Sequence, residues 1–103
     1  MLQNKSFQIK RLNNSIKFYL PRTEGYMEVI KDLSSEYMGM SLIEFDGYFE
    51  RKVEPAKYVM VQVHVDKMIE ENIIDQANAI RNKLRQRSLA LELNNELSLV
   101  EKK

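Results

Sequence analysis

The chain has 103 residues and nearly balanced charge, with 16 Lys and Arg residues against 15 Asp and Glu residues and a net charge of +1. This length predicts one domain over residues 1–103. The charge balance argues against a dedicated nucleic-acid or membrane-surface protein, and the lack of cysteine excludes disulfides, thiol chemistry and cysteine-based zinc sites. No apolar run is long enough for a signal sequence or a membrane span, so we predict a cytoplasmic protein.

Two segments near the N-terminus, residues 7–10 and 16–20, alternate apolar and polar side chains. A period of two predicts half-buried strands. Asn13 and Asn14 lie between them, and Asn tolerates the left-handed backbone of a tight hairpin turn. We therefore expect a hairpin that ends at Pro21, since proline cannot donate to a strand ladder.

A helix is expected next. Apolar side chains from Tyr26 to Tyr37 recur every three or four residues and form one stripe. Thr23 is placed to cap the start of this helix through its hydroxyl group. Gly39 follows the last periodic residue, where a C-terminal glycine cap is common.

The middle of the chain has strand composition. Residues 41–51 are rich in aromatic and branched side chains, and Asp46 and Gly47 interrupt their alternation, which favours a bulge in an edge strand. Residues 53–55 are predicted to connect this strand to the next. Residues 58–65 then place four valines on one face, and β-branched residues at this period favour a strand over a helix.

A second helix is expected over residues 67–86, capped by Asp66. Its acidic residues come early and its basic residues late, an order that matches the helix dipole. Residues 88–100 alternate again around Asn94 and Asn95, which predicts a second hairpin at the C-terminus.

This order of elements predicts an α+β fold. We expect a ferredoxin-like βαββαβ antiparallel sheet with two helices on one face and extra terminal hairpin strands. Right-handed crossovers would make residues 16–20 and 58–65 the central strands.

The alternation also divides the central strands into two faces. One face carries the apolar residues that the helices would cover. The other carries Lys17, Ala90, Glu92 and the candidate binding residues Tyr19, Tyr58, Met60, Gln62 and His64. Because an uncovered patch of this composition commonly contacts a partner, we predict binding through this face. The alternative is a face that meets only water or is covered by the terminal strands.

The second half of the chain resembles a known group. The segments Ala79-Ile80-Arg81 and residues 88–97, together with Gly47-Tyr48 and residues 58–63, are similar to small uncharacterised ferredoxin-like proteins of Gram-positive bacterial phages, plasmids and other mobile elements. Arg87 departs from the acidic residue common in that group. The resemblance implies a fold and a mobile-element setting, and it implies no activity or site residues.

Few residues carry recognisable chemistry. His64 and Asp66 would leave the same face of a strand, and such a pair could act as a general base or as part of a metal site. Asp66 is also explained by helix capping, and no further ligand lies nearby in sequence. Neither a nucleophile elbow nor a phosphate-binding glycine loop is present. We therefore predict no catalytic residue, no metal and no cofactor.

These observations lead to a predicted function. We expect a non-enzymatic binding or accessory protein that uses the open sheet face or an edge strand, as a homodimer or with a partner protein. The resemblance to proteins of mobile elements further implies that the partner bound by this protein is a component of the host. The alternative is single-stranded nucleic-acid binding through Tyr19, Tyr58 and His64, as RRM domains stack bases on a sheet. The missing RNP1 pattern and the charge of +1 count against this alternative.

Overall fold

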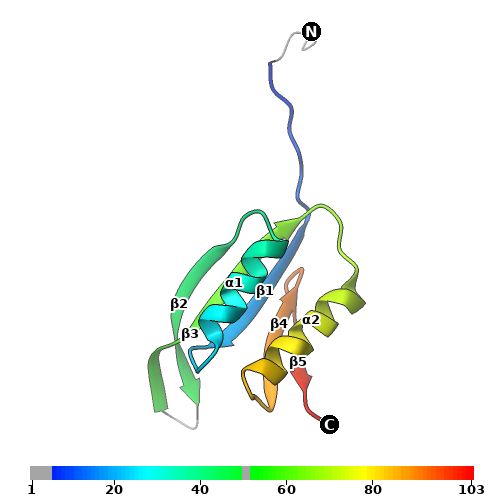
Figure 1. Cartoon of the computed structure of the whole chain (residues 1–103). Coiled ribbons are helices and arrows are strands. Elements are labelled where there is room, and N and C mark those ends of the chain that lie inside the picture. Colours follow the sequence, from blue (N-terminus) through cyan, green and yellow to red (C-terminus); the bar gives the residue numbers. More distant parts are fainter. Residues whose placement is uncertain (1–5, 50–51) are drawn as a thin grey trace.

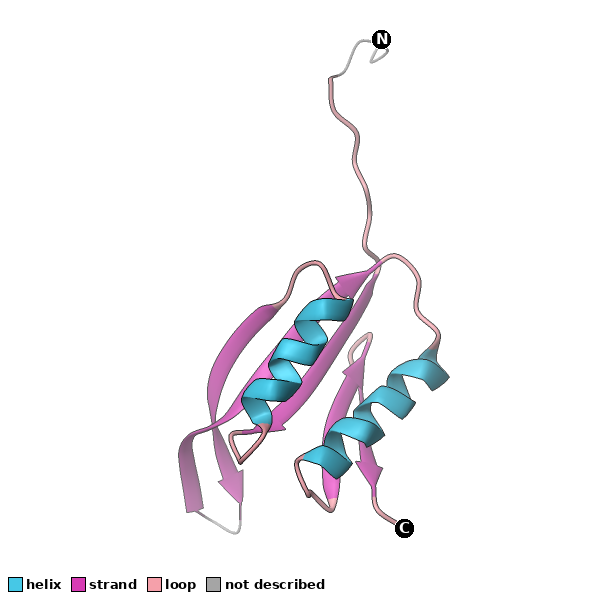
Figure 2. Cartoon of the chain, in the orientation of Figure 1, coloured by secondary structure: helices cyan, strands magenta, loops and turns pink. Residues whose placement is uncertain are grey.

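The computed structural model describes residues 6–49 and 52–103. It contains a five-stranded antiparallel sheet and two helices, and both helices cover the same face of the sheet (Figure 1, Figure 2). The elements in chain order are β1 (Asn14–Pro21), α1 (Tyr26–Glu36), β2 (Ser41–Phe49), β3 (Lys52–Val65), α2 (Glu70–Lys83), β4 (Ser88–Leu93) and β5 (Glu96–Glu101). The prediction of an α+β fold is confirmed at this level.

The sheet order is β2-β3-β1-β4-β5. The first strand therefore lies inside the sheet, with β3 on one side and β4 on the other, as the predicted central position of residues 16–20 requires. The two edges belong to β2 and β5. All neighbouring strands run antiparallel.

The core lies between the helices and the covered face of the sheet. Phe18 and Leu91 are fully buried at its centre, and Val29, Ala77 and Ile80 reach it from the helices. The side chains that the sequence assigned to the helix-covered face are all buried: Ile16, Phe18, Val59, Val61, Val63, Leu89 and Leu91. Period-two alternation in the strands therefore predicted this face correctly.

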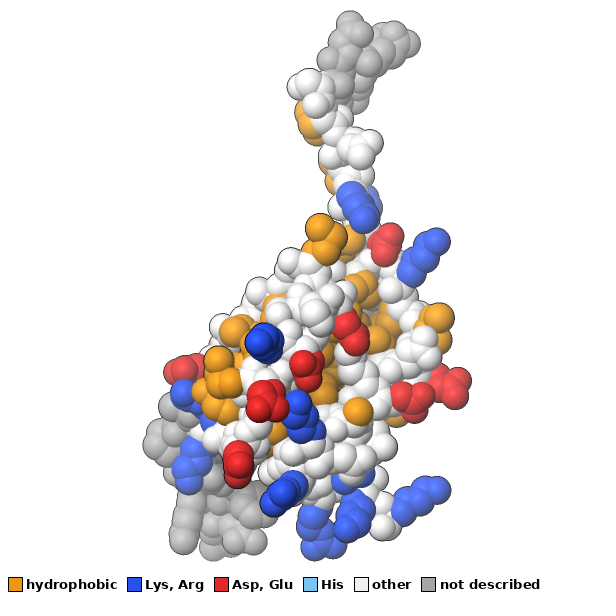
Figure 3. All heavy atoms as spheres, viewed as in Figure 1, with side chains coloured by type: hydrophobic (Ala, Val, Ile, Leu, Met, Phe, Trp, Pro, Cys, Tyr) orange, Lys and Arg blue, Asp and Glu red, His pale blue; other side chains and the backbone are white. Residues whose placement is uncertain are grey.

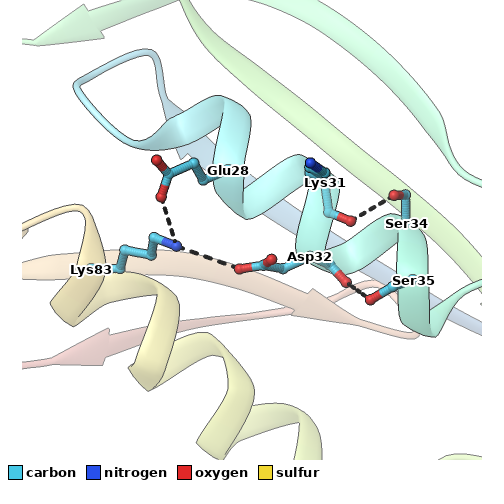
Figure 4. A network of polar contacts seen from close by, with 6 residues as sticks. All are labelled: Glu28, Lys31, Asp32, Ser34, Ser35 and Lys83. Carbon is cyan, nitrogen blue, oxygen red and sulfur yellow. Dashed lines mark hydrogen bonds and ion pairs between the residues drawn. The ribbon is translucent and has the colours of Figure 1, made fainter.

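The two helices are also joined by charge. Lys83, near the end of α2, places its ammonium group 3.1 Å from Glu28 and 3.5 Å from Asp32, both on α1 (Figure 4). The hydrogen bond to Glu28 and the charge of Asp32 raise the pKa of Lys83, although burial acts in the opposite direction. These contacts are exposed, and they link the start of α1 to the end of α2.

The predicted N-terminal hairpin is wrong. Residues 7–13 belong to no strand, and β1 begins at Asn14, inside the expected turn. The physical reason is that β1 already pairs on both sides, with β3 and with β4. No edge of β1 is left for residues 7–10. They instead form part of an extended arm that leaves the domain (Figure 1).

The C-terminal hairpin is confirmed, with β4 and β5 joined at Asn94 and Asn95. Both asparagines have positive φ, at 49° and 70°, which is the conformation that a tight two-residue hairpin turn requires. The turn is attached to the start of β1, because Asn94 Oδ1 accepts a hydrogen bond of 2.8 Å from the backbone N–H of Ser15.

Both helix caps predicted at the N-terminal ends are wrong. Helix α1 follows Gly25, whose φ of 93° suits glycine, and no side chain caps it; Thr23 instead offers its backbone carbonyl to the N–H of Tyr26. Helix α2 begins at Glu70 after Ile69, again with no side-chain cap. The Asp66 carbonyl accepts a hydrogen bond from Asn14 instead.

The C-terminal ends of the helices also differ from the predictions. Helix α1 stops at Tyr37, which is already extended, and Gly39 does not take the left-handed conformation of a glycine cap. Helix α2 is shorter than residues 67–86. It ends in a Schellman arrangement, in which Arg85 has a φ of 55° and the N–H of Gln86 donates to the carbonyl of Arg81.

The register of β2 with β3 shifts between Phe45 and Gly47, where an irregularity was predicted, but residues 55–57 of β3 lie opposite Asp46 alone, so the extra residues belong to β3 and not to the edge strand. The predicted connection at residues 53–55 is wrong, because β3 begins at Lys52. Arg51, the predicted end of the preceding strand, lies outside the described residues. Pro55 is tolerated in β3 because it lies within the register shift, between Glu54 and Tyr58, and β1 pairs only with residues 58–65, so proline occupies no paired position of the ladder.

Candidate functional site

The sheet face opposite the helices is the first candidate surface, and we call it the open face. A single row of side chains crosses it, because the strand pairs align Ile43 with Met60, Met60 with Tyr19, Tyr19 with Ala90, and Ala90 with Leu99. Ile43 and Leu99, at the two edges, are 46% and 57% exposed. This apolar row therefore spans all five strands, on the face opposite α1 and α2.

Three aromatic rings reinforce one end of the apolar row. Phe45 stacks on Tyr58 with ring centroids 5.4 Å apart, and it meets Tyr19 edge-on at 5.7 Å. Both geometries are favourable for aromatic pairs. Sequence reasoning placed Phe45 in a strand but missed it as a site residue, since its ring joins the tyrosines only through the β2–β3 register.

A polar row lies beside the apolar one. Lys17 and Glu92 are directly opposite each other on β1 and β4, and their charged groups are 2.9 Å apart. The hydrogen bond from Lys17 to Glu92 raises the pKa of Lys17. Gln62 lies on the other side of Lys17 in the same row. Because Lys17 is already paired with a carboxylate, it is poorly placed to bind a phosphate.

The structure divides the five predicted binding residues between two places. Tyr19, Tyr58 and Met60 are half-buried and belong to the apolar part of the open face. Gln62 is half-buried, His64 is exposed, and both help to line a groove at one end of the sheet. The nucleic-acid alternative stays a prediction, with the ring of Tyr58 already stacked on Phe45.

The groove has a volume of about 540 Å³ and is built from three separate segments. Lys10 and Leu12 from the N-terminal arm form one wall. Residues 36–41, which connect α1 to β2, form another, and the end of β3 with Gln62 and residues 64–66 completes it. The groove is therefore a product of the tertiary structure, since its walls are more than twenty residues apart in sequence.

One wall of the groove is held in place by hydrogen bonds between the helices. The Tyr37 hydroxyl donates to Gln76 Oε1 at 2.8 Å, and Gln76 Nε2 donates to Glu36 Oε2 at 2.6 Å. Burial, followed by the negative charge of Glu36, raises the pKa of Tyr37. Tyr37 is therefore a neutral hydrogen-bond donor at neutral pH, and the Glu36 carboxylate is oriented beside the groove.

The groove combines apolar and charged chemistry. Leu12, Met38 and Met40 offer apolar surface, while Glu36 and Asp66 offer carboxylates. His64 and Asp66, which were predicted to share one face of a strand, both line this groove. Within residues 6–49 and 52–103, no group of three or more His, Cys, Asp or Glu residues is arranged to hold a metal ion.

Comparisons with known proteins give one informative match. No protein-family model matches the chain, and no curated protein matches its sequence. Among solved structures, a phage SAM lyase in complex with S-methyl-5'-thioadenosine has a similar fold, with a TM-score of 0.62. The match covers 96% of this chain and 97% of that chain, at 11% sequence identity. At this identity the similarity shows a shared fold over the whole length.

This match corrects one prediction. The sequence motifs led us to expect a protein that is not an enzyme, because they contain no recognisable catalytic pattern. The fold matched along the full length of the chain is that of an enzyme, so the prediction is overturned. The physical reason is that a small domain can assemble a reaction site from residues scattered in sequence, which motif searches do not detect.

Across the described part of the chain, neither helix combines the length and apolar character that a membrane span needs.

Proposed function

We propose that the protein binds an adenosine-containing sulfur compound in the groove and acts on it as a lyase. The substrate would be S-adenosylmethionine. Its own carboxylate oxygen would bond to the γ-carbon of the amino-acid chain as the bond from that carbon to sulfur breaks, so the sulfur keeps the electron pair in the retained S-methyl-5'-thioadenosine and the amino-acid chain leaves as a lactone. The observation that supports this proposal is the fold similarity to a phage SAM lyase over 96% of the chain. The groove has a size and a chemistry that suit such a ligand.

The chemistry of the groove supports the proposal in two ways. An adenine ring and a methylthio group need apolar contacts, and Leu12, Met38 and Met40 provide them. A ribose needs hydrogen-bond acceptors, and a sulfonium ion favours nearby negative charge; Glu36 and Asp66 offer both. The volume of about 540 Å³ lies within the range of ordinary small-molecule sites.

The test uses Asp66→Asn with Asp75→Asn as a matched control, because Asp75 is an exposed carboxylate on α2 outside the groove. We expect calorimetric titration with S-methyl-5'-thioadenosine to show binding by the parent and the control. Binding by Asp66→Asn should be weaker by about ten- to a hundredfold, since a charge-assisted hydrogen bond contributes about 1.5–3 kcal/mol.

Turnover is measured separately. The parent protein is incubated with S-adenosylmethionine, and the mixture is separated by chromatography to detect S-methyl-5'-thioadenosine. Product above the rate of spontaneous decay is the expected result. Binding without turnover would contradict the lyase activity, and a lack of binding by the parent would contradict the site.

The strand order supports a finer description of the fold, which is part of the proposal. Four neighbouring strands in the order β2-β3-β1-β4, with a helix after β1 and another after β3, have the connectivity of a βαββαβ unit. We describe the fold as ferredoxin-like, with β5 added beside β4.

A second candidate function is association with another protein through the open face. The apolar row from Ile43 to Leu99, with no helix covering it, favours this candidate. Met60→Asp would place a charge at the centre of the row, and we expect it to abolish any complex that uses the face. Met27→Asp, on the exposed side of α1, is the matched control. Light scattering that finds the same mass for parent and Met60→Asp would count against this candidate.

A further inference from the structure

The N-terminal arm brings a positive charge to a groove whose other charged walls are acidic. Lys10 is the sole lysine or arginine among the described residues that line the groove, whereas Glu36 and Asp66 supply two carboxylates. Residues 7–13 belong to no helix or strand, and basic side chains are visible at the base of the arm (Figure 1, Figure 3). The groove therefore combines one ammonium group with two carboxylates.

Alternation along the arm directs Lys10 toward the groove. Lys10 and Leu12 both line it, and Arg11, which lies between them, does not. This is the pattern of an extended chain, in which side chains two residues apart leave on the same side and the side chain between them leaves on the other. The arm therefore presents its lysine and its leucine to the groove together, and Arg11 is a second arm cation outside it.

The base of the arm is fixed beside the groove. The side chain of Asn14 donates a hydrogen bond of 3.2 Å to the backbone carbonyl of Asp66 and accepts one of 2.9 Å from Asn94 Nδ2. The backbone N–H of Ser15 donates to Asn94 Oδ1, and the Ser15 carbonyl accepts from the backbone N–H of Asn94. The arm therefore starts next to Asp66, and Lys10 lies shortly before this fixed point in the chain.

Lys10 differs from two other lysines of the domain in having no carboxylate partner. Lys17 is paired with a carboxylate of β4, and Lys83 with two carboxylates of α1. Within residues 6–49 and 52–103, Lys10 forms no ion pair, although two carboxylates line the same groove. Its ammonium group is therefore available to pair with an anionic group of a ligand.

The charges of the groove complement those of S-adenosylmethionine. The sulfonium ion and the α-ammonium group of this compound are positive, and its α-carboxylate is negative. Two positive groups can thus face Glu36 and Asp66 while the negative group faces Lys10. S-methyl-5'-thioadenosine carries none of these charges, so a contact with Lys10 would favour the substrate over the product.

We propose that Lys10 binds the α-carboxylate of the substrate and thereby distinguishes S-adenosylmethionine from S-methyl-5'-thioadenosine. This inference rests on the proposed function, because it names the contact that the same groove makes with the amino-acid chain. The carboxylate loses its negative charge as its oxygen bonds to the γ-carbon. The ion pair with Lys10 is therefore stronger in the bound substrate than in the transition state, so Lys10 contributes to affinity and not to the rate of the chemical step.

Calorimetric titration with S-adenosylhomocysteine tests the contact without turnover, because this compound keeps the amino-acid chain but has a neutral sulfur. We expect Lys10→Gln to bind it about tenfold more weakly than the parent, and to bind S-methyl-5'-thioadenosine as the parent does. Lys10→Arg should recover most of the affinity, since arginine also pairs with carboxylates. Arg11→Gln, which removes a charge from the same arm outside the groove, should bind both compounds as the parent does.

Kinetics with S-adenosylmethionine give a second measurement. Lys10→Gln should raise KM by about tenfold and leave kcat unchanged, the pattern expected when an interaction of the bound substrate is lost and chemistry is slow relative to substrate dissociation. A lower kcat with an unchanged KM would overturn the inference, because it would place the contribution of Lys10 in the transition state.

The binding results separate a failure of the inference from a failure of the proposed function. If the parent binds both compounds and Lys10→Gln binds S-adenosylhomocysteine equally well, the role of Lys10 is overturned and the proposed site stands. Equal weakening of both compounds would also overturn it, since Lys10 would then support the groove and not the carboxylate. A parent that binds neither compound would contradict the proposed site and the inference together.

Discussion

We expect Phe18→Ala to lower the free energy of unfolding by about 3–5 kcal/mol, the usual cost of removing a fully buried phenylalanine side chain. Phe18 lies on the central strand β1, is 0% exposed, and is among the largest fully buried side chains of the described residues. A domain of this size has a total stability of about 5–15 kcal/mol. The substitution therefore removes a large share of it, and urea denaturation followed by circular dichroism measures the loss.

Phe45→Ala is the matched control for this prediction. It deletes the same atoms from the open face, where Phe45 is only partly buried against Tyr19 and Tyr58. We expect a loss of about 1 kcal/mol, in the range of a single aromatic pair. If Phe18→Ala and Phe45→Ala lower the free energy of unfolding equally, the covered and open faces contribute equally to stability. That result would contradict a core that lies between the helices and the covered face.

Arg81→Ala is expected to be the second most damaging substitution, with a loss of about 2–3 kcal/mol. Arg81, near the end of α2, is a charged residue that is only 7% exposed. Its guanidinium group donates to Asn78 Oδ1, to Asn82 Oδ1 and to the backbone carbonyl of Gln86, all at 2.9–3.1 Å. Removing the donor leaves those partly buried acceptors without their partner and loosens the connection from α2 to β4.

Arg81→Lys distinguishes this geometric role from a role of charge alone. A lysine keeps the positive charge but lacks the planar fork that reaches several acceptors at once. We expect Arg81→Lys to lose most of the stability that Arg81→Ala loses, as measured by thermal and urea denaturation. If Arg81→Lys is as stable as the parent, the positive charge alone is enough to stabilise this end of α2. That result would agree with the prediction that the late basic residues of this helix interact with the helix dipole.

Local patterns predicted the parts of the fold that depend on neighbouring residues in the chain. The buried faces of β1 and β3 follow from alternation alone, because successive side chains of a strand point to opposite sides. The turn at Asn94 and Asn95 follows from the tolerance of asparagine for positive φ. An irregularity near Asp46 and Gly47 was expected because they interrupt a run of strand-forming residues, and the register of β2 with β3 does shift there.

The wrong predictions share a different cause. Residues 7–10 alternate like a strand, but whether they pair depends on which strands flank β1, and those are β3 and β4. Thr23 and Asp66 are suitable capping residues, yet each helix begins three or four residues later. In both cases several positions satisfied the local rule, and contacts elsewhere in the fold selected among them.

Local residue patterns were enough to predict which side of each central strand is apolar, where the last hairpin turns, and the class of the fold. The full order of the strands in the sheet follows from contacts between distant segments. That order aligns Ile43, Met60, Tyr19, Ala90 and Leu99 in one row across the open face. It also brings the arm, the end of α1 and the end of β3 around one groove. The physical reason is that alternation repeats within a few residues, whereas strand order depends on contacts between segments far apart in the chain.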